Sequence, residues 1–263
     1  MNNPNLKTWI EKNNKETSYD YWNNEEIEKN KIFYLNENKS IEKLKKSKHL
    51  NEISAEFERI IALHNIDFTN NKIFSLGSGT GWIESNVLKK HKFKNLNLLD
   101  FSKHRIFYLA PKTVEKNIED LTNINFIHGS MYDLKIEDSS IDFFILSQAF
   151  HHAHDPLQLL GIMKQKLKIN GLIIIIGEPY FNFFKTIQHL GYHLVKYLIN
   201  YKSYRKFHYF LPSYNDVFPP DKIKGDNHYS IFDYHLMFKK FNFEFKNYVS
   251  KSKNTQSFIL LKK

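Results

Sequence analysis

The chain of 263 residues contains no cysteine, only three arginines and no long hydrophobic run. Without cysteine, disulfide bonds, thiolate nucleophiles and cysteine-ligated metals are excluded. The longest apolar run, Leu172 to Ile176, has the length of a strand, whereas a membrane-spanning helix needs about 20 apolar residues. The polar first 14 residues lack the basic-then-apolar layout of a secretory signal, so a cytoplasmic location is expected.

The net charge of +10 is carried almost entirely by lysines that are scattered among many asparagines and isoleucines. Cations clustered on one face attract phosphates by releasing counterions. The scarcity of arginine and the scattered lysines argue against a nucleic-acid partner. An acidic or phosphorylated small molecule fits the charge equally well.

The length allows one large α/β domain with a small cap. Residues 1–50 are rich in Asn, Lys and Glu, with aromatics such as Trp22, and they predict a helical cap over a main domain at 51–263. From Asn51 the apolar positions recur at helical spacing, and Ser54 is placed to cap or start a turn.

Strands and helices then alternate along the chain. The expected strands are 72–76, 96–99, 124–128, 141–146 and 172–176, and the expected helices are 82–90, 103–116 and 156–167. Such alternation implies crossover connections and a mostly parallel sheet with helices on both faces. In these sheets, ligands bind at the carboxyl ends of the strands, near the point where the strand order reverses.

The alternation stops after Gly177. A long aromatic and basic stretch, 180–228, follows, and we interpret it as an inserted lid that binds the substrate. A helix at 232–240 and strands at 244–249 and 256–261 are expected to complete the sheet.

The most informative motif is the loop Gly77-Ser78-Gly79-Thr80-Gly81, which joins a predicted strand to a predicted helix. Glycines at alternate positions let the backbone turn sharply and approach a ligand that a β-carbon would exclude. A dinucleotide fingerprint needs its third glycine one place later, where this chain has Trp82. The spacing therefore argues against nicotinamide and flavin dinucleotides.

With this loop the chain resembles the class I methyltransferases, from about Lys72 to Gly177. The resemblance implies a Rossmann-like, doubly wound sheet of seven strands that binds S-adenosyl-L-methionine. It implies a ribose contact from Asp100, an adenine contact from Phe101, and an adenine-edge segment at 128–131. The residues that it implies for cofactor binding are Gly77, Ser78, Gly79, Gly81, Asp100, Phe101, Ser130, Met131 and Ser147.

Two positions depart from the family pattern. The family often has an acidic residue where Ser75 stands, and often an aspartate where Ser130 stands. Each change removes an acceptor for the cofactor's ammonium or adenine amine, typically worth about 1–3 kcal/mol. Either the affinity is modest or other groups substitute. Asp100 also has a structural interpretation, as a helix cap before Ser102.

A hydroxyl acceptor needs its proton removed, and His152 is our preferred general base. An imidazole titrates near neutrality, and some family members carry a functional histidine at this place. His151 and Glu178 are the alternatives, although the first can be a packing residue and the second a strand terminator. A metal site is a further interpretation of His151, His152, His154 and Asp155, but neighbouring residues of one loop rarely converge on one ion, so no metal is expected.

The predicted function is O- or N-methylation of a small anionic, phosphorylated or sugar-type metabolite, such as a surface-polysaccharide precursor. An RNA-modifying methyltransferase is a second interpretation, which the scarce arginine and the absence of an Asn-Pro-Pro-Tyr type motif disfavour. A noncatalytic cofactor-binding protein is the third, because Ser75 and Ser130 depart from the family pattern. The sequence specifies neither the acceptor nor the oligomeric state.

Overall fold

The computed structural model describes residues 5–10, 37–180, 229–250 and 255–263, with the single positions Ile187, Gly191, Val195 and Asn227. The predicted insertion at 180–228 lies outside the described residues apart from Tyr180 and these four positions, and so does Trp22. The insertion therefore stays a prediction. Among the described helices none is long and apolar enough to cross a membrane.

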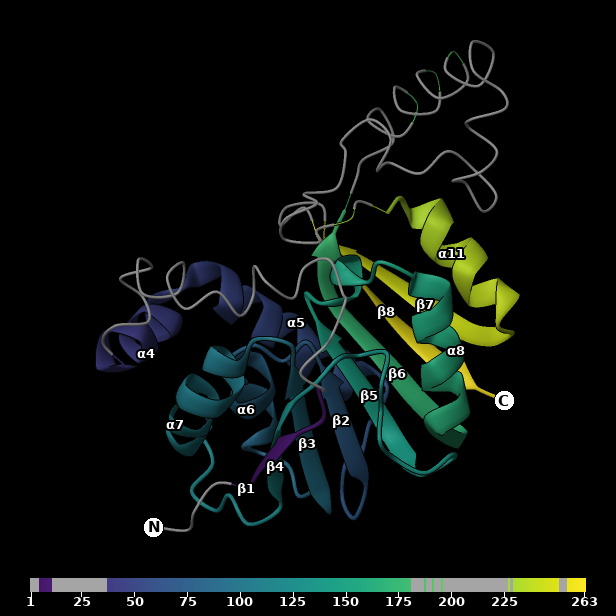
Figure 1. The fold of residues 1–263 in the computed structure, drawn as a ribbon. Coiled ribbons are helices and arrows are strands. Elements are labelled where there is room, and N and C mark those ends of the chain that lie inside the picture. The colour runs from purple at the N-terminus through teal and green to yellow at the C-terminus, as the bar shows by residue number, and fades with distance from the viewer. Residues whose placement is uncertain are drawn as a thin grey trace.

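An eight-stranded sheet forms the centre of the molecule (Figure 1), in the order β1-β4-β3-β2-β5-β6-β8-β7. Strands β1 to β6 pair in parallel with one another, whereas β8 runs antiparallel to both β6 and β7. The strands are β1 (Asn5–Thr8), β2 (Lys72–Leu76), β3 (Asn95–Asp100), β4 (Ile124–His128), β5 (Ile141–Ser147), β6 (Leu167–Pro179), β7 (Phe243–Ser250) and β8 (Thr255–Lys262). The Rossmann-like, mostly parallel sheet is confirmed.

The prediction of seven strands missed β1, which adds an edge strand beside β4. Three of its four residues are polar and all four are exposed, Leu6 included, so no hydrophobic pattern marks it. Parallel pairing with β4 holds it, and just after it the Trp9 N–H donates to the His128 carbonyl at 2.9 Å. The Trp9 ring also lies 5.9 Å from the Phe74 ring.

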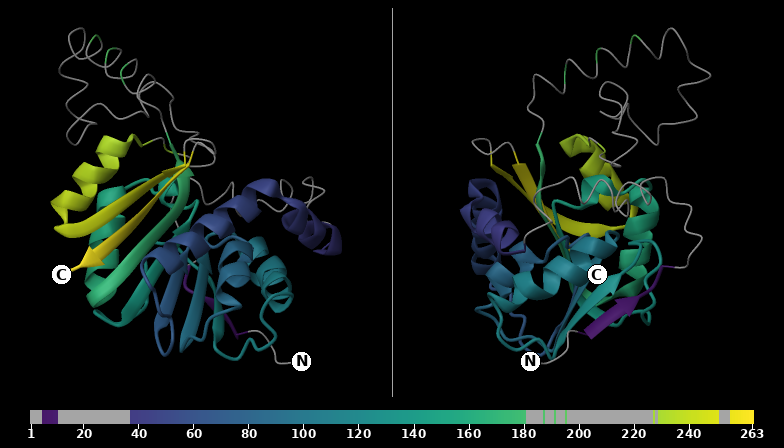
Figure 2. Two further views of the ribbon diagram at one scale, coloured as in Figure 1. Left: turned by 180° about the vertical axis from the view of Figure 1, so that it is seen from behind. Right: turned by 60° about the vertical axis from the view of Figure 1, so that its left-hand side comes forward.

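Helices cover both faces of the sheet (Figure 2). Helices α5, α6 and α7 pack on one face, and α8 and α11 pack on the other. The described helices are α4 (Glu37–Lys46), α5 (Lys48–Leu63), α6 (Trp82–Leu88), α7 (Ala110–Glu115), α8 (Pro156–Lys166) and α11 (Ile231–Lys240), with a π-turn η1 (Arg105–Leu109) and a 3-10 turn η2 (Phe150–His152).

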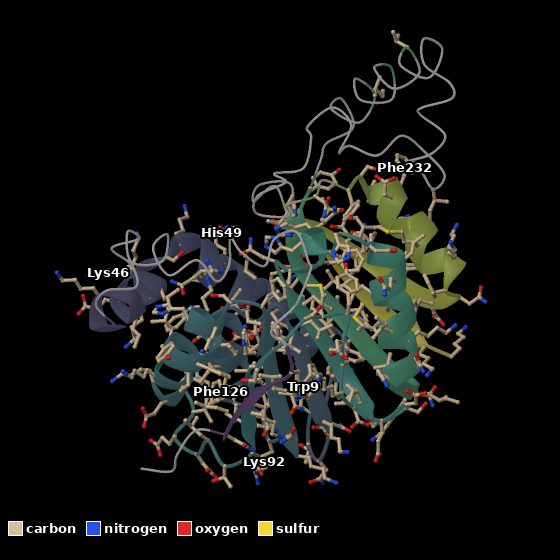
Figure 3. All side chains as sticks on the ribbon, viewed as in Figure 1. Trp9, Lys46, His49, Lys92, Phe126 and Phe232 are labelled. Carbon is tan, nitrogen blue, oxygen red and sulfur yellow. The ribbon has the colours of Figure 1, made fainter. Side chains whose placement is uncertain are left out.

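Two hydrophobic cores result, because successive side chains of a strand point to opposite faces. In β6, Ile173 and Ile175 join the core under α8 and α11, whereas Ile174 and Ile176 join the core under α5 and α6. Each fully buried side chain of this size contributes about 1.5–3 kcal/mol. Figure 3 shows Phe126 among the side chains that cover the strands.

Two helix predictions need correction. Helix α5 begins at Lys48, because the Ser47 side chain caps it by accepting from the Leu50 N–H, so Ser54 lies buried inside the helix and is not its cap. The segment predicted as a helix at 103–116 is helical without a break to residue 115 but is not α-helical throughout, because the π-helical η1 leads directly into α7. Pro111 has no N–H to continue the α-helical ladder, and the Ala110 N–H just before it donates five residues back, to the Arg105 carbonyl.

The strand order reverses beside β2, whose neighbours are β3 on one side and β5 on the other. The loop after β2 holds the five-residue glycine motif, and the ends of β3 and β5 bring Asp100 and Ser147 to the same edge. The fold therefore gathers the motifs from three separate parts of the sequence at the expected place for a ligand.

Candidate active site

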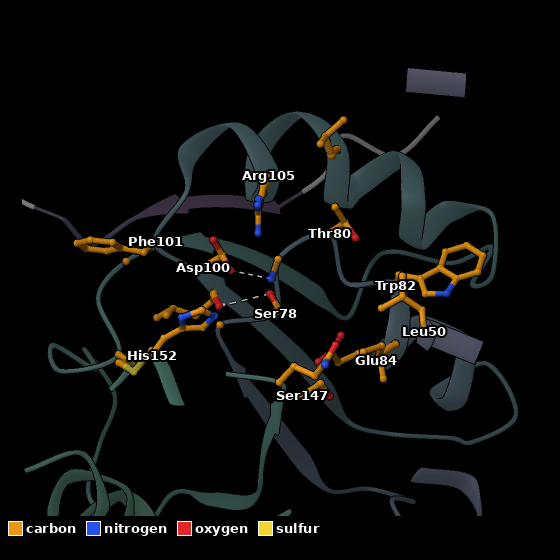
Figure 4. A pocket seen from close by; sticks show the side chains of 18 of the residues that line it. Leu50, Ser78, Thr80, Trp82, Glu84, Asp100, Phe101, Arg105, Ser147 and His152 are labelled. Atoms are coloured by element: carbon orange, nitrogen blue, oxygen red, sulfur yellow. Dashed lines mark hydrogen bonds between the residues drawn. The ribbon is translucent and has the colours of Figure 1, made fainter. Parts of the chain in front are cut away.

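A cavity of about 300 Å³ lies at the carboxyl ends of β2, β3 and β5 (Figure 4). The glycine loop, the residues after β3 and β4, and the segment after β5 line it. Two positions from the amino-terminal helices, Leu44 and Leu50, also line it. The helices expected as a cap over the core thus contribute apolar surface to this cavity.

Two glycines of the loop have different tasks. Gly77 and Gly79 both have positive φ, +66° and +55°, which L side chains rarely adopt. A β-carbon at Gly77 would lie 2.7 Å from the Ala149 Cβ, so this glycine lets the loop pack against the segment after β5. A β-carbon at Gly79 would meet no atom within 4 Å. Because Gly79 lines the cavity, its missing side chain leaves room for a ligand.

The loop's backbone N–H groups are largely committed within the protein. Ser78 N–H donates to the Leu99 carbonyl at 3.0 Å, Gly79 N–H to the Asp100 carboxylate at 2.7 Å, and Gly81 N–H to the Ser78 carbonyl at 2.8 Å. A loop that binds a diphosphate needs such donors turned toward the ligand. The position of Trp82, which lines the cavity, was the first argument against dinucleotide binding. The committed N–H groups of the loop are a second one.

Asp100 lies at the end of β3 and is almost fully buried. Its Oδ2 accepts from the Gly79 N–H, and its Oδ1 accepts from the Ser102 N–H at 2.8 Å. The carboxylate therefore caps the turn after β3 and also fixes the glycine loop. Each carboxylate oxygen can accept a second hydrogen bond, and Asp100 lines the cavity beside Phe101. Both residues thus fit a nucleoside, with a carboxylate for hydroxyl groups and an apolar ring for a base.

The structure brings most of the predicted cofactor residues to the cavity but not all. The cavity is lined by Gly77, Ser78, Gly79, Asp100, Phe101, Met131 and Ser147. Gly81 and Ser130 do not line it. Gly81 adopts a left-handed conformation before α6, where a β-carbon would lie 3.0 Å from Leu98 and Val114. Ser130 is buried, and its hydroxyl accepts from the Tyr132 N–H at 3.1 Å.

The two adjacent histidines face different surroundings. His152 lines the cavity, and Figure 4 shows its ring on the same side as Phe101. The ring of His151 lies outside the cavity lining, with its Nδ1 2.9 Å from Glu178 Oε2. The rings of the two histidines contact each other, with centroids 4.2 Å apart. Only His152 of this pair is therefore placed to meet a ligand in the cavity.

Glu178 is fully buried behind the segment that carries His152, and it does not line the cavity. Its Oε1 accepts from the backbone N–H groups of Ala149 and Phe150, and its Oε2 accepts from the His151 N–H and the Tyr234 hydroxyl. Burial acts to raise the pKa of Glu178, but the contact with His151 and these hydrogen bonds hold it below its ordinary value. The geometry gives Glu178 the position of a residue that holds this segment in place.

Among the polar lining residues that sequence reasoning did not assign to the site, Glu84 and Arg105 carry charged groups. Glu84, in the first turn of α6, is buried, and its Oε1 accepts from the Ser75 hydroxyl at 2.8 Å. Burial raises the pKa of Glu84, and the nearby Asp100 raises it further. The signal in the sequence was a single acid among apolar and small residues directly after the glycine loop. Among the described residues no group of three or more His, Asp or Glu side chains is placed to hold a metal ion.

The central part of the chain is similar to known proteins. Residues 74–175 match the family model described as a methyltransferase domain. The chain is 27% identical to the malonyl-[acyl-carrier protein] O-methyltransferase of Halalkalibacterium halodurans over 39% of this chain and 37% of the relative. It is 26% identical to the 2-methyl-6-phytyl-1,4-hydroquinone methyltransferase 1 of Oryza sativa subsp. japonica over 40% of this chain and 30% of that protein. The matches span about a third of the length of these curated relatives.

Solved structures share the fold. An S-adenosylmethionine-dependent methyltransferase of Aquifex aeolicus superimposes with a TM-score of 0.53 at 15% identity, over 84% of this chain and 95% of that one. A candidate methyltransferase of Methanococcus maripaludis gives a TM-score of 0.53 at 18% identity, over 96% of this chain and 97% of that one. Residues 74–175 thus match a methyltransferase domain, and the sheet has the fold of solved structures described as S-adenosylmethionine-dependent methyltransferases.

Proposed function

We propose that the protein transfers the methyl group of S-adenosyl-L-methionine to an oxygen or nitrogen atom of a small anionic metabolite, phosphorylated or of the sugar type. One observation carries this proposal: Gly79, Asp100 and His152 line a single cavity of about 300 Å³. The space left by Gly79 and the carboxylate of Asp100 suit the nucleoside, and His152 adds a group that can accept a proton.

Different lining residues are proposed to contact different parts of the cofactor. Asp100 accepts hydrogen bonds from hydroxyl groups, and Phe101 and Met131 offer apolar surface to a base. When bound, the cofactor supplies an electrophilic methyl group on a sulfonium. The protein then has to align the acceptor with that methyl group and exclude water. The apolar side chains of Leu44 and Leu50 in the lining support the second task.

His152 is the proposed general base. An imidazole nitrogen of His152 would accept the proton of an acceptor hydroxyl when the methyl group passes from the sulfonium to that oxygen and leaves S-adenosylhomocysteine. The cavity lining supports this role, because His152 lies in it and His151 and Glu178 do not. Glu178 positions His152 indirectly, since its carboxylate binds three successive backbone N–H groups, at residues 149–151.

Two hydrogen-bond donors in the lining support an anionic acceptor. Arg105 and His154 line the cavity and can donate to a phosphate or carboxylate, whereas the carboxylates Asp100 and Glu84 are assigned to the cofactor. The relative from Halalkalibacterium halodurans is named for O-methylation of malonyl-[acyl-carrier protein], whose malonyl group is itself an anion. An acceptor with a phosphate or carboxylate would gain charge-assisted hydrogen bonds from the same side chains.

The test is release of S-adenosylhomocysteine by the purified protein with a panel of acceptors. The panel contains sugar phosphates, malonyl thioesters, neutral sugars, hydroquinones and RNA. Turnover confined to anionic small molecules supports the proposal. Turnover with RNA that falls steeply with salt would support the RNA-modifying alternative. Cofactor binding without turnover on any acceptor would favour a noncatalytic protein.

A further inference from the structure

A buried carboxylate borders the cavity and has no cationic partner in the described part of the chain. Glu84 is 1% exposed, and within the described ranges no lysine, arginine or histidine forms an ion pair with it. Its hydrogen bond comes from the neutral hydroxyl of Ser75, at 2.8 Å. A buried ionised carboxylate is costly unless it is paired. The ligand is therefore the natural source of the missing cation.

Capping of helix α6 is the structural alternative, since Glu84 lies in the first turn of that helix. Carboxylates there are favoured by the helix dipole even when they are exposed to water. Capping explains neither the complete burial of Glu84 nor its position in the cavity lining. Figure 4 shows Glu84 beside Ser147, at the edge of the cavity formed by the ends of the strands.

We propose that Glu84 is the counter-anion for the ammonium group of the bound cofactor and that the Ser75 hydroxyl orients it. This inference rests on the proposed function, because it assumes that S-adenosyl-L-methionine occupies the cavity. Ser75 lies on β2, and its hydroxyl donates to Glu84 Oε1 at 2.8 Å. A carboxylate from α6 thus reaches the space that a carboxylate at position 75 would reach. Exchanging the two residue types between these positions therefore tests the assignment.

Glu84→Gln tests the ion pair with little change of shape. Calorimetry would compare three ligands: S-adenosylmethionine, S-adenosylhomocysteine and 5′-methylthioadenosine, which lacks the amino-acid end. We expect the substitution to weaken the first two by roughly 10- to 100-fold, because both carry the ammonium group, and to leave the third unchanged. Equal loss for all three ligands would show that Glu84 shapes the cavity, and loss for S-adenosylmethionine alone would assign its partner as the sulfonium. Either result overturns the proposal. If the native protein binds none of the three, it is the proposed function that fails.

The exchange of positions gives a sharper test. In the native background, Ser75→Asp should weaken binding of S-adenosylhomocysteine, because two carboxylates would then share one buried space. In Glu84→Ser, the same Ser75→Asp substitution should restore affinity by at least about tenfold. Glu58→Gln, in an exposed ion pair with Lys90, is the control and should change nothing. Loss of affinity from Ser75→Asp in both backgrounds would refute the exchange.

Stability of the ligand-free protein separates the two roles of Glu84. Because folding raises the pKa of Glu84, its contribution to stability is present at low pH and is lost as pH rises through the folded pKa. The free energy of unfolding of Glu84→Gln, relative to that of the native protein, should therefore increase as pH rises. If Glu84 acted only as a helix cap, the variant would instead become less stable than the native protein as pH rises. The cavity has other titratable or charged side chains: Asp100, Arg105, His152 and His154. Both proteins contain them, so the difference in the pH dependence of stability comes from Glu84. A variant that is less stable than the native protein throughout the alkaline range would leave only the capping role.

Discussion

The carboxylate of Asp100 and the backbone N–H of Gly79, 21 residues apart in sequence, are joined by a hydrogen bond of 2.7 Å. This bond ties the end of β3 to the middle of the glycine loop. Asp100 therefore has two roles at the cavity: it lines the cavity, and it holds the shape of the glycine loop. Substitutions at this position should affect affinity more than the fold.

For Asp100→Ala we expect loss of measurable S-adenosylmethionine binding by calorimetry in a protein that still folds. The free energy of unfolding should fall by about 1–3 kcal/mol, because the buried N–H groups of Gly79 and Ser102 lose their acceptor. Asp100→Asn keeps one oxygen and should give an intermediate affinity. Unchanged affinity in a folded Asp100→Ala protein would place the cofactor elsewhere.

Alanine at Gly77 and at Gly79 should have opposite consequences. Both substitutions force a non-glycine residue into the left-handed region, at about 1–3 kcal/mol each. Gly77→Ala adds a clash with Ala149 worth about 1–3 kcal/mol more, so it should be the less stable variant in urea unfolding. Gly79→Ala should keep most of its stability and lose cofactor affinity, because its β-carbon enters the open space. Equal affinities for the two variants would contradict this division.

The central strands of the sheet were predicted from the sequence more accurately than its edge strand β1. Strands with buried β-branched residues, such as 72–76 and 124–128, lie at the predicted bounds. Strand β1 was missed because pairing with β4, rather than an apolar pattern, holds it. The π-helical turn before Pro111 was missed because the apolar periodicity of the segment continues through it.

For the candidate site, the order of the motifs in the sequence predicted which segments meet, but it did not predict where their side chains point. The glycine loop and Asp100 were found because the chain needs those residue types at fixed places in this fold. The different surroundings of His151 and His152 depend on the turn η2 and on Glu178, 27 residues away from His151. Glu84 was missed because its environment depends on Ser75 and on the end of β5.

Glu178→Gln should destabilise the protein at neutral pH by about 1–3 kcal/mol, since the amide replaces an ionised acceptor of several hydrogen bonds. Folding lowers the pKa of Glu178, so its contribution is present above the unfolded pKa of about 4.3 and is lost as pH falls through the folded pKa. The difference in free energy of unfolding between the native protein and the variant, measured with urea, should therefore become small at acidic pH. The exposed Glu58→Gln variant is the control. A gap that does not change with pH would mean that shape rather than charge sets the role of Glu178.

His152→Ala should lower turnover by roughly 10²- to 10⁴-fold, the usual range for loss of a general base, and leave cofactor affinity nearly unchanged. His151→Ala should act differently, because the His151 ring contacts buried Glu178 and not the cavity. We expect His151→Ala to lower the stability of the protein and to lower turnover less than His152→Ala does. Steady-state kinetics on both variants, with calorimetric cofactor binding as the control, measures the difference once an acceptor is known. An acceptor that is already ionised needs no base, and full turnover in His152→Ala with a carboxylate acceptor would mean that alignment alone drives the transfer. Full turnover in His152→Ala with a hydroxyl acceptor would refute the assignment of the general base to His152.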